Sequence, residues 1–166
     1  MSKIYIGVDN GPTGSIGVVG TRSDVFIKTP TKFEQNYTKA KGNITRLHAV
    51  QFKAFLMQYV SRIETTLIIL ERPFKNPKFF KSTCTALRCF EAQLAIIESL
   101  EFPHRYCDSK EWQRNILPKG TKGAPELKKA SLDIGSRLFP QFKELMKKQK
   151  DADGILIAEN ARREKW

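Results

Sequence analysis

Four carboxylates adjoin short apolar runs of the sequence, where a side chain can be held in a fixed position; they are Asp9, Glu71, Asp151 and Asp153. Hard divalent cations prefer oxygen ligands from several carboxylates, and phosphodiester hydrolysis commonly uses two such ions. Burying these acids without a partner would be costly. One explanation of the pattern is therefore a cation site to which distant parts of the chain contribute.

Each of these acids also has a purely structural explanation. Asp9 suits the turn that follows it, and Glu71 could pair with Arg72 or with a lysine. Asp151 and Asp153 precede a helix-compatible apolar run, and an aspartate there can cap backbone N–H groups and interact favourably with the helix dipole. The spacing along the chain leaves both explanations open.

The composition predicts a basic protein with a polyanionic partner. The 166 residues include 29 Lys and Arg against 17 Asp and Glu, which gives a net charge of +12 and a sequence pI near 9.8. For such a chain nucleic acid is a commoner partner than a membrane. The length and a 40% hydrophobic content fit one domain over residues 1–166 with its own core.

The same composition argues against several other classes. Three cysteines without a close CxxC pair suggest neither a disulfide framework nor a zinc cluster. We find no leader pattern and no apolar run near the roughly 18 residues that a membrane span needs. We therefore expect a cytoplasmic protein without a membrane partner.

Alternating and continuous apolar patterns predict an α/β fold. Turn-rich residues 10–14 between two β-prone runs indicate a hairpin, and an apolar run that ends at Glu71 indicates a strand buried on both faces. The predicted strands are 4–8, 16–19, 25–27, 67–70 and 104–107. Apolar residues recurring every three or four positions predict helices. The first predicted helix begins at Arg46. The apolar positions of the four predicted helices fall within 52–63, 83–97, 127–138 and 155–163.

Two polar stretches connect these elements. Residues 28–43 are lysine-rich and contain Pro30 and Gly42, so we expect a long surface connection there. Residues 72–77 contain two prolines, which prevent regular structure. In an α/β sheet, Asp9 and Glu71 would then emerge at the carboxyl ends of strands, where ligands tend to bind.

Three segments resemble the acidic motifs of RuvC-type Holliday junction resolvases: Ile6–Gly11, Leu70–Phe74 and Asp153–Ala158. The resemblance spans most of the chain. Arg46 and Leu47 at the expected start of the first helix are similar to the family as well, as is the stretch 119–124 followed by Lys128. The resemblance to this family implies an RNase H-like fold, with a mixed central sheet of antiparallel hairpin strands and parallel crossovers flanked by helices.

The resemblance also implies an activity and a partner. Members of the family act as homodimers on four-way DNA junctions and use Mg²⁺ or Mn²⁺, two ions per active site, held by four acids. Asp9, Glu71, Asp151 and Asp153 would be the catalytic metal ligands here. The small size suggests a bacteriophage member, which would act in the cytoplasm of a bacterial host.

Two positions depart from the family pattern. Asn10 stands where the family often has proline, which affects only the turn. Lys150 stands three residues before Asp153, where the family usually has an acid or a histidine. Asp151 can take that role if the last helix begins at about Asp153, because a non-helical approach frees it from helical spacing.

Basic and aromatic residues suggest how DNA would be bound. The family places an aromatic that probes the junction centre where Phe74 stands; the alternative is a loop aromatic folded onto the core. Lysines near the acidic segments suggest phosphate contacts, although any one cluster could be a solvated surface. The candidate DNA contacts are Phe74, Lys75, Lys78, Lys81, Lys110, Lys119, Lys122, Lys128 and Lys129.

Two other functions remain open from the sequence. An actin-like or sugar-kinase-like phosphotransferase also opens with an acidic strand and a Gly/Thr turn like 9–14, but such enzymes need two comparable domains, and the charge of +12 would be unexplained. An architectural protein could bind branched DNA, four-way junctions or forks, without cleaving it. Its acids would then be structural only.

Overall fold

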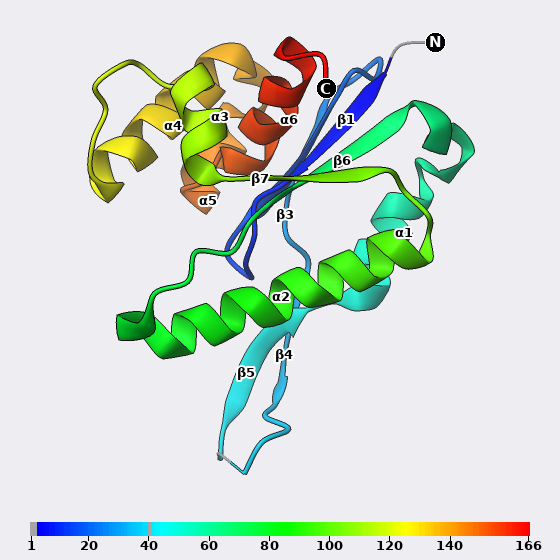
Figure 1. The fold of residues 1–166 in the computed structure, drawn as a ribbon, viewed down its shortest axis with the longest axis vertical. Helices are drawn as coiled ribbons and strands as arrows, with labels where there is room; N and C mark the ends of the chain where they lie inside the picture. The colour runs from blue at the N-terminus through cyan, green and yellow to red at the C-terminus, as the bar shows by residue number, and fades with distance from the viewer. Residues whose placement is uncertain (1–2, 40) are drawn as a thin grey trace.

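A computed structural model describes residues 3–39 and 41–166 (Figure 1). Within them, five strands form the main sheet in the order β3-β2-β1-β6-β7. Strands β1, β2 and β3 pair antiparallel, whereas β6 pairs parallel with both β1 and β7. These strands are β1 Ile4–Val8, β2 Ser15–Val19, β3 Val25–Lys28, β6 Thr66–Glu71 and β7 His104–Cys107. The predicted mixed sheet is confirmed.

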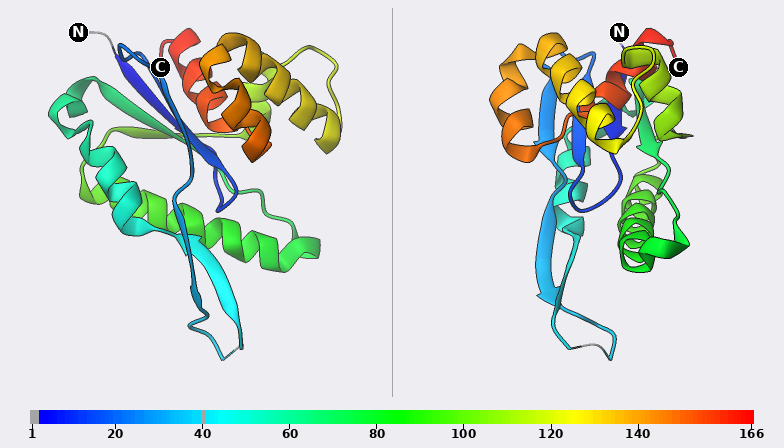
Figure 2. Two further views of the ribbon diagram at one scale, coloured as in Figure 1. Left: turned by 180° about the vertical axis from the view of Figure 1, so that it is seen from behind. Right: turned by 90° about the vertical axis from the view of Figure 1, so that its left-hand side faces the viewer.

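Helices cover both faces of this sheet (Figures 1 and 2). Helices α1 and α2 pack on one face, and α3, α4, α5 and α6 gather on the other. The α-helices are α1 Ala49–Met57, α2 Phe80–Ser99, α3 Ser109–Ile116, α4 Ala124–Leu138, α5 Lys143–Gln149 and α6 Asp153–Arg163. Short 3-10 helices lie at Val60–Thr65, Pro77–Phe79 and Pro140–Phe142.

The alternation of side chains along β1 divides the core into two layers. Ile4, Ile6 and Val8 are buried against α1 and α2, while Tyr5 belongs to the layer under α6. The central strands β1 and β6 are almost wholly buried, as expected for strands covered on both faces.

Glycines allow α6 to approach the sheet very closely. Gly7 and Gly17 lie opposite each other on β1 and β2. A Cβ atom on Gly7 would lie 2.2 Å from the carbonyl oxygen of Gly154, and one on Gly17 would lie 2.2 Å from Cα of Ile155. The start of α6 therefore rests directly on the backbone of the two strands, and this contact fixes where the residues before it can lie.

The prediction for residues 28–43 was wrong. Instead of a loop, they contribute to a separate two-stranded antiparallel sheet of β4 (Thr31–Gln35) and β5 (Asn43–Leu47). Glu34 of β4 forms an ion pair with Arg46 of β5, which links the two strands, and a second ion pair with Lys32 on its own strand. The sequence hid these strands because their charged side chains lie mostly at the surface and give no apolar alternation.

The start of the first helix was also predicted wrongly. Arg46 and Leu47 end β5, and α1 begins at Ala49. The ring Nδ1 of His48 accepts a hydrogen bond of 3.3 Å from the backbone N–H of Gln51, which caps this helix in an unusual way.

Two helices escaped prediction. Helix α5 is only seven residues long, and α3 is eight residues long with a mostly polar sequence. Asp108 and Glu111 form a capping box at the start of α3. That pattern is visible in the sequence and would have located the helix.

None of the helices in the described part of the chain is both long enough and apolar enough to cross a membrane.

We predict that Gly17→Ala lowers the free energy of unfolding by about 1–3 kcal/mol or more, because its methyl group would overlap the backbone of α6. Thermal unfolding should show a lower Tm, by roughly 2–4 °C for each kcal/mol. Ser61→Ala at an exposed position is the control and should change little. An unchanged Tm for Gly17→Ala would mean that α6 does not pack closely on β2.

Candidate active site

Asp9 and Glu71 meet at one edge of the main sheet. Val8 pairs with Leu70 in the parallel register of β1 and β6, so the next residue on each strand is one of the two acids. Carboxyl ends of parallel neighbours open on the same side of a sheet. Asp9 and Glu71 therefore lie at the carboxyl ends of adjacent strands, as predicted.

Asp151 and Asp153 reach this edge through the turn between α5 and α6. Lys150 ends α5 in the left-handed conformation with φ 54°, and α6 begins at Asp153. The hydroxyl of Ser15 accepts a hydrogen bond of 3.0 Å from the backbone N–H of Gly154. This bond and the glycine contacts hold the first turn of α6 beside the end of β1.

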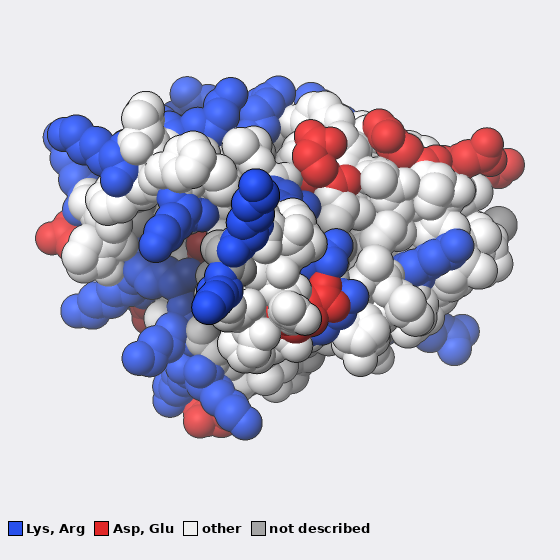
Figure 3. All heavy atoms as spheres, turned by 90° about the horizontal axis from the view of Figure 1, so that it is seen from below, with Lys and Arg blue, Asp and Glu red and all other residues white. Residues whose placement is uncertain are grey.

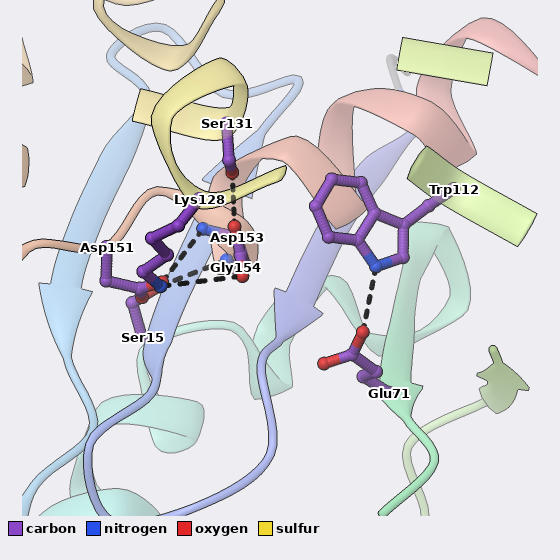
Figure 4. A network of polar contacts seen from close by, with 8 residues as sticks. All are labelled: Ser15, Glu71, Trp112, Lys128, Ser131, Asp151, Asp153 and Gly154. Atoms are coloured by element: carbon purple, nitrogen blue, oxygen red, sulfur yellow. Dashed lines mark hydrogen bonds and ion pairs between the residues drawn. The ribbon is translucent and has the colours of Figure 1, made fainter. Parts of the chain in front are cut away.

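The structure brings three of the four predicted acids tightly together. Carboxylate oxygens of Asp9, Asp151 and Asp153 all lie within 4.8 Å of one another. Glu71 lies outside this group, but it lines the same cavity as Asp153. Its Oε1 accepts a hydrogen bond of 2.9 Å from the indole N–H of the buried Trp112, as Figure 4 shows.

The cluster carries negative charge that the protein only partly compensates. Burial raises the pKa of Asp9 well above its usual range, and the charges of Asp151, Glu71 and Asp153 raise it further. Burial and then Asp151 raise the pKa of Asp153 to about 6, although Lys128 and the Ser131 hydroxyl oppose the shift. Keeping all these acids ionised therefore requires additional positive charge.

Lys128 from α4 supplies part of that charge. Its Nζ lies 2.8 Å from Oδ1 of Asp151 and 3.7 Å from Oδ2 of Asp153. Burial alone would lower the pKa of Lys128, but Asp153 and Asp151 raise it above its usual value. Figure 4 shows this lysine directed into the acidic cluster. Sequence reasoning placed it among the DNA contacts, whereas here its ammonium group pairs with carboxylates.

Two unsatisfied acceptors indicate that a cation fits this cluster. Oδ2 of Asp151 and Oδ1 of Asn10 are buried and have no hydrogen-bond partner among the described residues. Buried acceptors without a partner are costly. The available donors are carboxylate and amide oxygens, which suit hard divalent ions such as Mg²⁺ or Mn²⁺.

Helix capping accounts only weakly for Asp151. The residue at the N-cap is Ala152, which has no side chain to cap with. Oδ1 of Asp151 is 3.4 Å from the backbone N–H of Asp153, a long contact, while the Asp151 side chain is only 2% exposed. Its burial beside two other acids is what remains to be explained, and a cation would explain it.

A cavity of about 490 Å³ opens beside the acids, between the end of β6 and the start of α2. Glu71 and Asp153 line it, together with Phe74 and Phe79. Phe74 is 77% exposed, so the alternative that it packs onto the core is wrong. Its proposed contact with DNA stays a prediction.

Most of the predicted lysine contacts lie on the surface. Figure 3 shows Lys and Arg crowding one part of a face and surrounding a hollow there. Lys110, Lys119 and Lys122 also line a second cavity of about 440 Å³ between α3 and α4. Seven of the eight predicted lysines are exposed: Lys75, Lys78, Lys81, Lys110, Lys119, Lys122 and Lys129.

Comparison with protein-family models and with curated proteins finds no match. Among solved structures, RuvC of Thermus thermophilus in complex with a Holliday junction substrate is similar with a TM-score of 0.55 at 12% identity. The match covers 96% of this chain and 93% of that one. The fold is RuvC-like. This confirms the predicted RNase H-like architecture.

Two further structures are similar to this chain. A second Thermus thermophilus RuvC structure has a TM-score of 0.50 at 13% identity, covering 98% of this chain and 96% of that one. A Fowlpox virus resolvase in complex with Holliday junction DNA has a TM-score of 0.40 at 15% identity, covering 95% and 92%. At such identities the likeness concerns the fold.

The RuvC-like fold also places polar residues that sequence reasoning missed. Trp112 holds Glu71, and the hydroxyl of Ser131 donates to Oδ1 of Asp153. The capping box before Trp112 is a signal that could have placed it on a helix. For Ser131, which lies on α4 far from Asp153 in sequence, we find no signal.

We predict that Asp9→Asn raises the Tm of the metal-free protein at pH 7.5. Because burial raises the carboxyl pKa values in the folded state, the folded protein is favoured at low pH. For Asp153 this advantage disappears as the pH rises from its usual pKa of 3.8 to the folded value of about 6. Above that pH the acids repel one another, and removing one charge relieves the repulsion.

Thermal unfolding in EDTA and in Mg²⁺ tests this prediction. The wild-type protein should gain stability from Mg²⁺, since a ligand that binds only the folded state stabilises it, whereas Asp9→Asn should gain little. Asp133→Asn, an exposed acid on α4, is the matched control and should respond to Mg²⁺ like the wild type. A lower Tm of Asp9→Asn in EDTA would contradict the electrostatic account.

Proposed function

We propose that this protein is a divalent-metal-dependent endonuclease that nicks branched DNA, with four-way junctions as its first substrate. The observation that carries the proposal is the convergence of Asp9, Asp151 and Asp153 beside Glu71 at strand ends of a RuvC-like fold. A strongly basic chain around an acidic cavity suits a substrate that carries phosphates. The similar RuvC structure holds a Holliday junction substrate, which supports the substrate class.

The acids would hold the ions through their carboxylate oxygens. Asp9, Asp151 and Asp153 would hold one ion, and Glu71 with Asp9 would hold a second. When bound, Mg²⁺ or Mn²⁺ would lower the pKa of a water molecule and neutralise charge on the leaving oxygen, which gives 5′-phosphate and 3′-hydroxyl ends. The indole N–H of Trp112 occupies one oxygen of Glu71 and thereby fixes the orientation of the other.

Lys128 would act as the internal counter-ion of this site. It pairs with Asp151 and Asp153 where a divalent ion would otherwise neutralise them. Its side chain is 43% exposed, so its ammonium group can also reach a phosphate at the mouth of the cavity. The predicted contact with DNA and the observed ion pair are therefore compatible.

Branched DNA would be held by phosphate contacts and by an aromatic wedge. The exposed lysines among the candidate DNA contacts would contact the backbone. Phe74, exposed at the cavity rim, would stack on a base or enter the junction centre. A homodimer would present two such sites with two-fold symmetry, as paired nicks on opposing strands require. Action in the cytoplasm of a bacterial host, with a phage origin, belongs to the same proposal.

One observation favours a second candidate. The ion pairs of Lys128 neutralise part of the acidic cluster without any metal, as a purely structural cluster would require. An architectural protein that binds junctions without cleaving them is thus the alternative. A two-domain phosphotransferase is not favoured, because the described residues form one main sheet.

The deciding experiment incubates the protein with labelled four-way, forked and linear DNA in Mg²⁺ and maps the products at nucleotide resolution. We expect nicks in branched DNA, with cleavage reduced at least about 100-fold by Asp9→Asn, Glu71→Gln, Asp151→Asn or Asp153→Asn, since each removes a ligand charge at nearly constant volume. Junction binding should persist in all four variants. Binding by the wild type with no nicking in Mg²⁺ or Mn²⁺ would favour the architectural alternative.

We also predict that Phe74→Ala reduces cleavage of four-way junctions about 10-fold or more while reducing binding less, because a wedge acts mainly by placing the scissile phosphate. Val50→Ala, which truncates an exposed apolar side chain on α1, is the control. Nicking rates and anisotropy binding curves separate the two effects. Equal cleavage by the Phe74 variant and the wild type would remove Phe74 from the substrate contacts.

A further inference from the structure

The strands β4 and β5 form an arm that projects from the body of the molecule past α2 (Figures 1 and 2). Each strand has five residues. At ~3.3 Å per residue the paired strands alone extend about 17 Å, a length over which duplex DNA carries about 10 charges. An isolated two-stranded sheet is only marginally stable in water, so the arm needs side-chain contacts to keep its strands paired.

The arm is basic and exposes aromatic rings. Segment 28–47 contains five Lys and Arg residues and one acid, Glu34. Phe33 is 71% exposed and Tyr37 is 63% exposed. The guanidinium groups of Arg46 and of Arg88 from α2 lie 5.4 Å and 5.6 Å from the centre of the Tyr37 ring. Exposed aromatic rings among cations are typical of surfaces that bind nucleic acid.

Three hollows of the surface share lining residues and so follow one another from the acids to the arm; together they are called the groove below. The cavity of the candidate site shares Asn10, Ser82 and Ala86 with a neighbouring hollow of about 360 Å³. That hollow shares Pro12 and Thr85 with a third hollow of about 90 Å³. The groove therefore runs between the β1–β2 turn and α2.

Cations line this groove along its course. Lys81 lies at the middle hollow, and Lys32, Arg46 and Arg88 line the hollow at the base of the arm. The arm continues beyond this point with Lys39 and Lys41, which are exposed and have no ion-pair partner among the described residues. Positive charge thus extends from the acidic cavity to the tip of the arm.

We propose that the groove and the β4–β5 arm bind one duplex arm of the branched DNA as it leaves the candidate site. This proposal rests on the proposed function, since it takes the substrate class from there. It assigns the substrate contacts of a segment that sequence reasoning had treated as a surface connection. The cations contact phosphates, and the exposed rings of Phe33 and Tyr37 pack against the DNA backbone.

The charge of the arm favours DNA over a second copy of this chain. Two copies meeting through their arms would bring like charges together, and such contacts are costly. A polyanion, in contrast, gains affinity through every lysine, because each phosphate contact releases counter-ions. Exposed lysines on a two-stranded sheet also oppose pairing of its edges with another strand.

The test measures the affinity of a four-way junction for the double variant Lys39→Gln with Lys41→Gln at several salt concentrations. Fluorescence anisotropy in EDTA keeps the DNA intact, so the result does not depend on nicking. Loss of two phosphate contacts should reduce the slope of log K against log[salt] by about 1.8 and weaken binding several-fold at moderate salt. Lys53→Gln with Lys165→Gln removes the same charge from α1 and the C-terminal end and should keep the wild-type slope.

A second variant guards against an effect of the substitutions on folding. Replacing residues 37–41 by Asn-Gly removes both lysines, keeps the hydrogen bond from the backbone N–H of Asn36 to the carbonyl oxygen of Gly42 and closes the arm with a tight turn. In this variant the slope of log K against log[salt] should fall by at least as much as in the double lysine variant. The hydroxyl-radical footprint on one duplex arm should become shorter, and the Tm should stay nearly unchanged.

A wild-type slope in both arm variants would overturn the proposal. So would a change in oligomeric state by sedimentation velocity without a change in slope, because the arm would then contact another copy of the chain. Absence of nicking by the wild-type protein would defeat the proposed nuclease function but would leave the arm's contact with DNA to be judged by the salt slope.

Discussion

The close contact between α6 and the glycines of β1 and β2 is the constraint on which the candidate site depends. Asp9 is held by a buried strand, whereas the position of α6 brings Asp151 and Asp153 to it. With Gly7, Gly17 and Gly154 lacking side chains, the helix lies directly on the sheet backbone, and its first residue comes within reach of the end of β1. Any side chain at those positions would push α6 outward and separate the acids.

This geometry gathers like charges at a cost in stability, and a bound cation would relieve that cost. The folded protein holds Asp9 and Asp153 at raised pKa values, leaves Oδ2 of Asp151 unsatisfied and recruits Lys128 as a partial counter-ion. Under the proposed function, a divalent cation bound at this site would stabilise the folded protein. Under the proposed function, the surrounding basic surface would attract the phosphate backbone of DNA to the cavity that Glu71 and Asp153 line.

The sequence predicts the features that depend on local interactions and misses those that depend on contacts between distant segments. Strands β1 and β6 and the acids at their ends were predictable, because apolar runs that stop at a carboxylate imply a strand and its end. Residues Trp112, Ser131 and Lys128 were not linked to the acids, since contacts between α3 or α4 and the strand ends leave no periodic pattern. The β4–β5 arm was missed for a different reason: its strands are stabilised by charged pairs such as Lys32 with Glu34, and lysine-rich stretches are typical of loops.

We propose that the converging carboxylates form a divalent cation site. The most direct measurement is an anomalous difference map from crystals of the protein soaked in Mn²⁺. We expect a peak in contact with oxygens of Asp9, Asp151 and Asp153, with the ammonium group of Lys128 displaced from Asp151 and with Glu71 still bound by Trp112. A map without a peak at these residues, with Lys128 still paired to Asp151 at high Mn²⁺ concentration, would contradict the account.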